Sequence, residues 1–176
     1  MLDLSGVDAN DKWAVLRRIK DDLILKNGLV MDDVDEHKPW GAYYRFTSEC
    51  AENFVADYFP GRTVEELGRG GSISPKFLVF QPGKKLSLQY HNRRAEVWHV
   101  IYGDLVAAVS DSNEEGDWKT YPSGSELSYG ALTRHRAGAV EGGGWVIVAE
   151  IWQHTDPAKP TDEADIVRLA DDFGRA

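Results

Sequence analysis

The sequence has little cysteine and no long apolar run. Its single cysteine, Cys50, excludes an intrachain disulfide and is typical of a reducing, cytoplasmic environment. No apolar stretch approaches the roughly 18–20 residues of a membrane-spanning helix, and the N-terminus lacks the basic start and apolar core of a signal peptide. We therefore expect a cytoplasmic protein that has no membrane partner.

Basic residues are also scarce. Twenty Lys and Arg stand against 29 Asp and Glu, which gives a formal net charge of −9. Nucleic acids and anionic membranes are bound by basic surfaces that displace counterions, so this balance argues against both partners. The 176 residues, 42% of them hydrophobic, can fill one core and exclude wholesale disorder. The sequence predicts a single domain over residues 1–176.

Hydrophobic spacing changes character near residue 37. Residues 1–37 are expected to form a helical N-terminal extension, because apolar side chains recur there at helical spacing: Trp13, Leu16, Ile19, Leu23 and Ile24. Over residues 38–176, short β-rich runs between turn residues predict a mainly β barrel. The expected strands are 42–46, 76–81, 86–90, 96–102, 104–110, 117–122 and 145–152. A short C-terminal helix is expected from Thr161 or Asp162 to Asp172.

The segment 82–103 carries most of the chemistry. Gln89 and His91 are two residues apart on one expected strand, so their side chains share a face. Glu96 begins the next strand after a short connection, and a hairpin can bring the three side chains together. His135 adds a second imidazole from a later strand. Mixed nitrogen and oxygen ligands suit divalent Zn, Mn, Fe, Co or Ni, although a histidine such as His91, taken alone, is more often a hydrogen-bonded barrel residue than a ligand.

These spacings resemble the two motifs of the cupin superfamily. The residues that match the first motif at every interval are Gly83, Gln89, His91, Glu96 and Gly103, with Gln89 where most cupins have a histidine. The second motif is matched by Gly124 and His135 but not by Gly130 and Leu132. A narrower resemblance is to the type II mannose-6-phosphate isomerase (phosphomannose isomerase) domain. Three segments match this domain: residues 82–103, Lys38-Pro39-Trp40-Gly41 and the tail 164–175. The tail contains Asp165-Ile166-Val167-Arg168 and Gly174-Arg175.

The resemblance implies a cupin, or jelly-roll, barrel and a divalent metal ion held by Gln89, His91, Glu96 and His135. It also implies a sugar or sugar-phosphate substrate. Many such proteins carry an upstream nucleotidyltransferase domain. None is found here, so we expect a stand-alone isomerase-type cupin. Small cupins commonly pair, and a homodimer is expected; the apolar N-terminal helix could cover its own barrel or a partner's.

Interconversion of an aldose and a ketose requires a general base beside the reacting carbons. Glu150 is the only ionisable residue of the 145–152 strand and is the candidate base, with pairing to a buried arginine as the alternative. A phosphate would require cationic donors. Those adjacent to the proposed ligands are Lys85, Arg93, Arg94, Arg134 and Arg136, of which Lys85 and Arg94 are also expected to act in catalysis.

The leading hypothesis is thus a metal-dependent sugar-phosphate isomerase that works by enediol proton transfer. One alternative keeps the enzyme and replaces its substrate by a free sugar, as in lyxose-type isomerases. A second is a non-catalytic sugar-binding cupin, which the departures at Gly130 and Leu132 would allow. A metal-dependent dioxygenase is also chemically open to such a barrel. His99 lies on the opposite strand face from Glu96, and packing or an interface is expected there.

Overall fold

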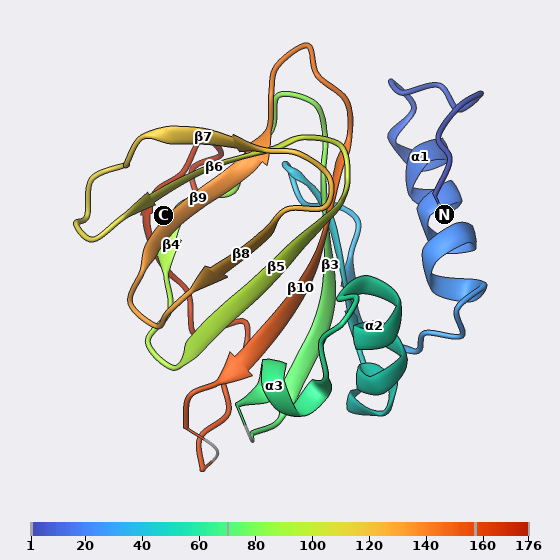
Figure 1. Ribbon diagram of the computed structural model, residues 1–176. Helices are drawn as coiled ribbons and strands as arrows, with labels where there is room; N and C mark the ends of the chain where they lie inside the picture. Colours follow the sequence, from blue (N-terminus) through green and yellow to red (C-terminus); the bar gives the residue numbers. More distant parts are fainter. Residues whose placement is uncertain (1, 70, 157, 176) are drawn as a thin grey trace.

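Two antiparallel β-sheets face each other in the computed structural model, which describes residues 2–69, 71–156 and 158–175 (Figure 1). The six-stranded sheet has the order β1 (Met31–Asp35), β2 (Gly41–Phe46), β3 (Ile73–Phe80), β10 (Val146–His154), β5 (Arg94–Tyr102) and β8 (Glu126–Tyr129). The five-stranded sheet has the order β11 (Val167–Ala170), β4 (Leu88–Tyr90), β9 (Arg134–Ala139), β6 (Leu105–Ser110) and β7 (Trp118–Tyr121). The predicted mainly β barrel is confirmed.

Strand alternation divides the apolar residues of the central strands between two cores. On β3, Phe77 and Val79 belong to a core shared with the helices, whereas Leu78 and Phe80 belong to the core between the two sheets. β10 divides in the same way. Since side chains two residues apart share a face, every second residue of β3 and β10 points into the barrel. Strands buried on both faces read as continuous apolar runs, as the 145–152 segment does.

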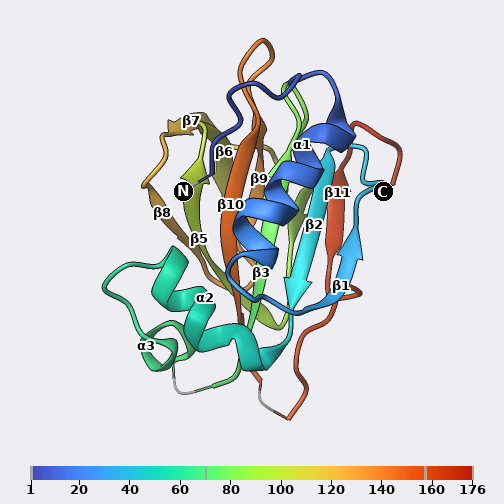
Figure 2. The same ribbon diagram turned by 90° about the vertical axis from the view of Figure 1, so that its right-hand side faces the viewer.

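Helices cover the outer face of the six-stranded sheet, as Figure 2 shows for α1 (Lys12–Ile19). The π-helix η1 (Lys20–Leu25) continues α1, and η2 (Ser48–Cys50), α2 (Ala51–Tyr58) and α3 (Val64–Gly68) follow β2. The Asp11 side chain caps α1 by accepting the backbone N–H of Trp13 and Ala14 at 3.0 and 3.1 Å. Leu16, Ile19 and Ile24 are buried in the outer core. The predicted N-terminal helix therefore covers the chain's own barrel.

Two parts of the chain differ from the sequence prediction. The short C-terminal helix predicted up to Asp172 is wrong: residues 158–175 contain no helix, and Val167–Ala170 form β11 instead. Pairing explains the difference, because Val167 lies opposite Tyr90 and Arg168 opposite Gln89 on β4, whose backbone satisfies that of the tail. The N-terminal extension also contains strand β1, so it is not wholly helical. Among the described residues, no helix has the length and apolar character needed to cross a membrane.

Candidate active site

Asp165 from the tail holds the connection between β4 and β5 in place. These strands belong to different sheets and do not pair, so the hairpin expected from the sequence is wrong. The Asp165 carboxylate accepts the backbone N–H of Asn92 at 3.1 Å and of Arg93 at 2.9 Å, and the Thr161 hydroxyl donates to it at 2.9 Å. Burial alone would raise the pKa of Asp165, but these donors hold it below its ordinary value. The backbone oxygen of Asp165 lies 2.7 Å from Nδ1 of His91. The tail therefore orients both the connection between β4 and β5 and the imidazole of His91.

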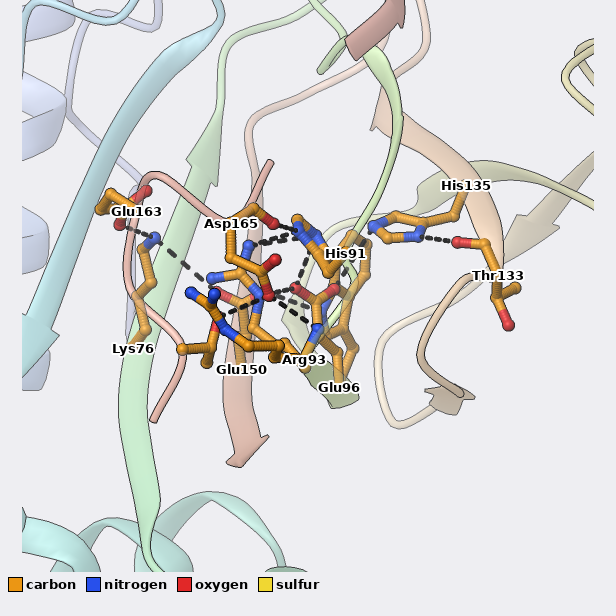
Figure 3. A network of polar contacts seen from close by, with 12 residues as sticks. Lys76, His91, Arg93, Glu96, Thr133, His135, Glu150, Glu163 and Asp165 are labelled. Carbon is orange, nitrogen blue, oxygen red and sulfur yellow. Dashed lines mark hydrogen bonds and ion pairs between the residues drawn. The ribbon is translucent and has the colours of Figure 1, made fainter. Parts of the chain in front are cut away.

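His91, Glu96 and His135 meet inside the barrel (Figure 3). One ligand atom from each lies within 4.8 Å of the others, and all three residues are buried. His91 Nε2 is 3.1 Å from Glu96 Oε1, and His135 Nε2 is 3.3 Å from Glu96 Oε2. The β4–β5 connection, β5 and β9 thus bring together three of the four residues predicted as metal ligands.

The hydrogen bonds of the two imidazoles assign their protons. His91 Nδ1 faces the carbonyl of Asp165, and His135 Nδ1 lies 3.0 Å from the carbonyl of Thr133. A carbonyl oxygen only accepts, so we place the proton on Nδ1 in both rings. Each Nε2 then faces one oxygen of Glu96. These buried atoms require a positive charge between them, which a proton or a divalent metal ion can supply.

The protonation states fit the same requirement. Burial lowers the pKa of His91, which favours the neutral ring that metals bind. Burial would raise the pKa of Glu96. When protons lie on the Nε2 atoms that face it, the charge and hydrogen bonds of His91 and His135 hold that pKa well below its ordinary value, so the carboxylate stays ionised. Glu96 Oε2 and His135 Nε2 have no hydrogen-bond partner in the described part of the chain. This donor set fits a divalent cation of the zinc, manganese or iron type.

Arg94 lies against this group and supplies positive charge to it. Its Nε is 3.1 Å from Glu96 Oε1, and its Nη2 is 2.6 Å from Nδ1 and 3.1 Å from Nε2 of His91. Since Nδ1 donates to Asp165, we assign the donation from Arg94 to Nε2. The guanidinium also stacks on Trp152, 3.8 Å from the ring centroid. The prediction that Arg94 lies at the site is consistent with this position.

Gln89 lies opposite His135 in the register of β4 and β9, so their side chains share a face of the sheet. Its side-chain oxygen accepts a hydrogen bond from the Ser87 hydroxyl at 2.8 Å. Gln89 is buried and lines the pocket beside Glu96. Its place next to the three clustered residues is compatible with the predicted fourth ligand.

Glu150 points into the barrel from β10, on the same face as Val146 and Val148. Trp98 Nε1 donates to its Oε1 at 2.9 Å, whereas Oε2 is buried and lacks a hydrogen-bond partner among the residues described. Lys76 Nζ lies 4.0 Å from that free oxygen. Burial, followed by the nearby charge of Glu96, raises the pKa of Glu150 to about 7. A carboxyl group that changes protonation near neutral pH is suited to general acid–base catalysis.

A pocket that is partly open to solvent lies beside these groups, and it contains about 480 Å³ of empty space when the solvent at its mouth is counted. Its lining residues are Lys38, Trp40, Lys76, Leu78, Leu86, Ser87, Gln89, Arg94, Glu96, Glu150, Trp152, Glu163, Ile166, Arg168 and Arg175. The lining therefore contains several cations and two tryptophans around the buried carboxylates. Nε of Arg168 is buried without a hydrogen-bond partner in the described residues. An anion in the pocket would satisfy it.

Four of the predicted cations do not line this pocket. Lys85 packs on Trp118, 4.5 Å from its ring centroid and away from the pocket. Arg93 lies in the connection between β4 and β5, where its Nη2 is 3.9 Å from Oδ1 of Asp162. Arg134 bonds to Asn113 and to the backbone of Leu132, and Arg136 bonds to Glu115 and Asp172. Alternation explains the last two, because His135 between them takes the inward position.

Sequence reasoning missed four other pocket cations: Lys38, Lys76, Arg168 and Arg175. A signal was present for three of them, since Lys38 belongs to the Lys-Pro-Trp-Gly segment and Arg168 and Arg175 to the tail. Lys76 precedes Leu78 and Phe80 by even steps on one strand, which places it on the inward face. The prediction for His99 is confirmed: its Nδ1 contacts the backbone oxygen of Tyr58, and its ring packs on Phe59 outside the barrel.

Comparisons with known proteins agree with this geometry. The family described as mannose-6-phosphate isomerase C-terminal matches residues 47–120. The alginate biosynthesis protein AlgA of Pseudomonas aeruginosa is 33% identical over 60 residues, which is 34% of this chain and 12% of that protein. AlgA of Pseudomonas putida is 31% identical over 61 residues, 35% of this chain and 13% of that protein. The chain thus aligns with only about an eighth of these relatives' length.

The fold has counterparts among solved structures. Oxalate decarboxylase from Bacillus subtilis, at pH 4.6, superposes with a TM-score of 0.53 and 17% identity, over 80% of this chain and 31% of that one. A likeness at this identity concerns the fold alone. The chain has the cupin fold, and it resembles the mannose-6-phosphate isomerase C-terminal family.

Proposed function

We propose that the protein is a metal-dependent aldose–ketose isomerase whose substrate is a sugar phosphate of the mannose 6-phosphate type. The observation that carries the proposal is the closeness of two buried groups to one pocket, which Glu96 and Glu150 both line. One is the His91–Glu96–His135 group, whose ligand atoms converge as they would around a divalent metal ion. The other is Glu150, whose free oxygen and raised pKa suit a base. The resemblance to the mannose-6-phosphate isomerase C-terminal family supports the same reaction class.

His91, Glu96, His135 and Gln89 would hold the metal ion. When bound, a divalent metal supplies Lewis-acid stabilisation of negative charge on the sugar oxygens. Glu150 removes the proton from C2 of the aldose and returns a proton to C1. The hydrogen bond from Trp98 fixes one of its oxygens at 2.9 Å and leaves the other free to accept that proton. General-base assistance of this kind contributes typically about 10²–10⁴-fold in rate.

The pocket cations bind the phosphate. Arg168 has a buried Nε without a partner among the described residues, and Arg175 and Lys38 line the same pocket. Arg175 is held by Asp171 through a 2.5 Å contact, which fixes its guanidinium. Arginine presents paired donors that match a phosphate group. This unpartnered arginine favours a phosphorylated substrate over the free sugar considered from the sequence.

The test is an isomerase assay of protein loaded separately with Zn, Mn, Co, Ni and Fe. We expect conversion of mannose 6-phosphate to fructose 6-phosphate with at least one metal, and weaker activity on free mannose. The matched inactive variant is Glu96→Gln, which removes the carboxylate with little change of volume. Absence of turnover with every aldose and ketose tested, phosphorylated or free, would contradict the proposal. It would favour the non-catalytic sugar-binding alternative.

A further inference from the structure

Lys76 is a buried lysine in the pocket for which the proposed reaction has so far no use. It is 4% exposed and lies on the inward face of β3 with Leu78 and Phe80. Its ammonium group lies over the rings of Tyr43 and Trp152, 4.2 and 4.4 Å from their centroids. Lysine is seldom buried to this degree unless it is paired. The contacts of its nitrogen therefore indicate its role.

Two carboxylates stand near the Lys76 nitrogen. Nζ lies 2.7 Å from Oε1 of Glu163 and 4.0 Å from Oε2 of Glu150. Figure 3 shows Lys76 between these two residues. Glu163 comes from the connection between β10 and β11, and its side chain is 35% exposed. An ion pair with one exposed partner stabilises a fold by about 1 kcal/mol or less. Anchoring Glu163 is thus a weak reason to bury a lysine.

The second carboxylate points to chemistry instead. Glu150 Oε2, the oxygen that faces Lys76, is buried and lacks a hydrogen-bond partner in the described residues. Both Lys76 and Glu150 line the pocket. A substrate lying beside the free oxygen of Glu150 would therefore also lie beside the ammonium group. The two groups stand as an acid and a base on one side of the pocket.

Aldose–ketose isomerisation requires two proton transfers of different kinds. One proton moves between C2 and C1, and another moves between the oxygens that those carbons carry. Resting on the proposed function, we propose that Lys76 is a catalytic residue that transfers the proton between the two oxygens, while Glu150 transfers the proton between the two carbons.

The steps balance as follows. The Glu150 carboxylate takes the C2 proton, the C–H pair forms the C1–C2 double bond, and the carbonyl pair moves to O1, which takes a proton from the Lys76 ammonium. The result is a neutral enediol, a carboxylic acid and an amine. The Lys76 amine then takes the proton of O2, whose bonding pair forms the C2 carbonyl. The double-bond pair takes the proton of Glu150 at C1, and both side chains return to their starting states.

Three variants separate this role from a structural one. Lys76→Met removes the proton donor, and Lys76→Arg keeps the positive charge next to Glu163 but cannot release a proton in a protein. Glu163→Gln removes the ion pair and leaves Lys76 in place. We expect both Lys76 variants to lose about 10²–10³-fold in kcat with little change in KM, and Glu163→Gln to lose less than about tenfold.

A second readout is exchange of the C2 hydrogen of mannose 6-phosphate with deuterium from D₂O. In the Lys76 variants Glu150 still removes that proton, so exchange should fall less than isomerisation and the ratio of the two rates should rise. Thermal melting and metal content, compared with the wild type, identify a variant that has failed to fold. Lys76→Arg serves as the test if Lys76→Met is unstable.

The outcomes are distinct. Full activity of Lys76→Arg, an equal loss in Glu163→Gln, or equal losses of exchange and isomerisation in the Lys76 variants would each overturn the role of Lys76 and leave the isomerase proposal standing. A metal-loaded wild type that neither isomerises nor exchanges any sugar phosphate would overturn both proposals.

Discussion

Full burial of the Glu150 carboxyl group links catalysis to stability. Burial raises the pKa of this group to about 7, above its ordinary value of 4.5, so the folded protein favours the protonated form. The contribution of Glu150 to stability is therefore highest below its ordinary pKa and is lost as the pH rises from about 4.5 to about 7. Above that range the fold keeps a buried negative charge for the benefit of the reaction.

Glu150→Gln should abolish this loss. We expect the metal-free variant to be more stable than the wild type at pH 8, by on the order of 1–3 kcal/mol, and to lose that advantage by pH 5. Its isomerase activity should fall by about 10²–10⁴-fold. Urea denaturation at the two pH values checks the first result. A stability difference that does not depend on pH would contradict the assignment of the raised pKa.

Arg168 provides the second test at the residue scale. Its buried, unpartnered Nε lies in the pocket wall, whereas Arg134 is bonded outside the pocket to Asn113. Arg168→Gln should raise KM for mannose 6-phosphate by about 10–100-fold with a smaller effect on kcat, because it removes ground-state binding of the phosphate. Arg134→Gln is the matched control and should leave both constants near their wild-type values. Equal KM values for the two variants would place the phosphate elsewhere.

At the scale of elements, the tail and the connection between β4 and β5 form one unit. Asp165 accepts the backbone donors of Asn92 and Arg93, and β11 pairs with β4. The same residue's carbonyl orients His91. Ligand orientation by such partners is known to affect metal affinity by about 10–100-fold when it is removed.

Asp165→Asn should therefore affect two measurable quantities. We expect a loss of about 1–3 kcal/mol in the free energy of unfolding, because the charge-assisted hydrogen bonds from the backbone of Asn92 and Arg93 are weakened. We also expect weaker metal binding in a calorimetric titration. Asp162→Asn is the control. The Asp162 side chain is exposed, and its ion pair with Arg93 is long, at 3.9 Å. If metal affinity is unchanged in Asp165→Asn, the orientation of His91 does not depend on the Asp165 carboxylate.

Local patterns predicted the parts of the fold that depend on neighbouring residues. The glycines of the first motif show why: Gly83 and Gly103 have φ angles of 71° and 75°, which turn the chain before and after the ligand-bearing strands. Spacing also predicted that Gln89, His91 and Glu96 lie close together, and they do, although β4 and β5 belong to different sheets and not to one hairpin. Strand β11 was mistaken for a helix because its partner, β4, is distant in the sequence, and pairing overrides local preference.

At the scale of the whole molecule, the pocket is assembled from segments far apart in the chain. Lys38 precedes β2, Lys76 belongs to β3, and Arg168 and Arg175 belong to the tail. Sequence proximity to the ligands favoured Lys85 and Arg93 instead, and both point elsewhere. The stacking of the two sheets decides which cations face the barrel interior. The spacing of residues within the 82–103 segment does not contain that information.

Metal binding at the His91–Glu96–His135 group is the central claim of this account. Elemental analysis of purified protein, after loading with each of the five metals and removal of excess, tests it most directly. We predict about one tightly bound metal ion per chain in the wild type, loss of that ion in Glu96→Gln, and retention in Glu115→Gln, whose carboxylate pairs with Arg136 away from the pocket. A wild type that retains none of the metals, or a Glu96→Gln variant that retains as much as the wild type, would contradict the claim.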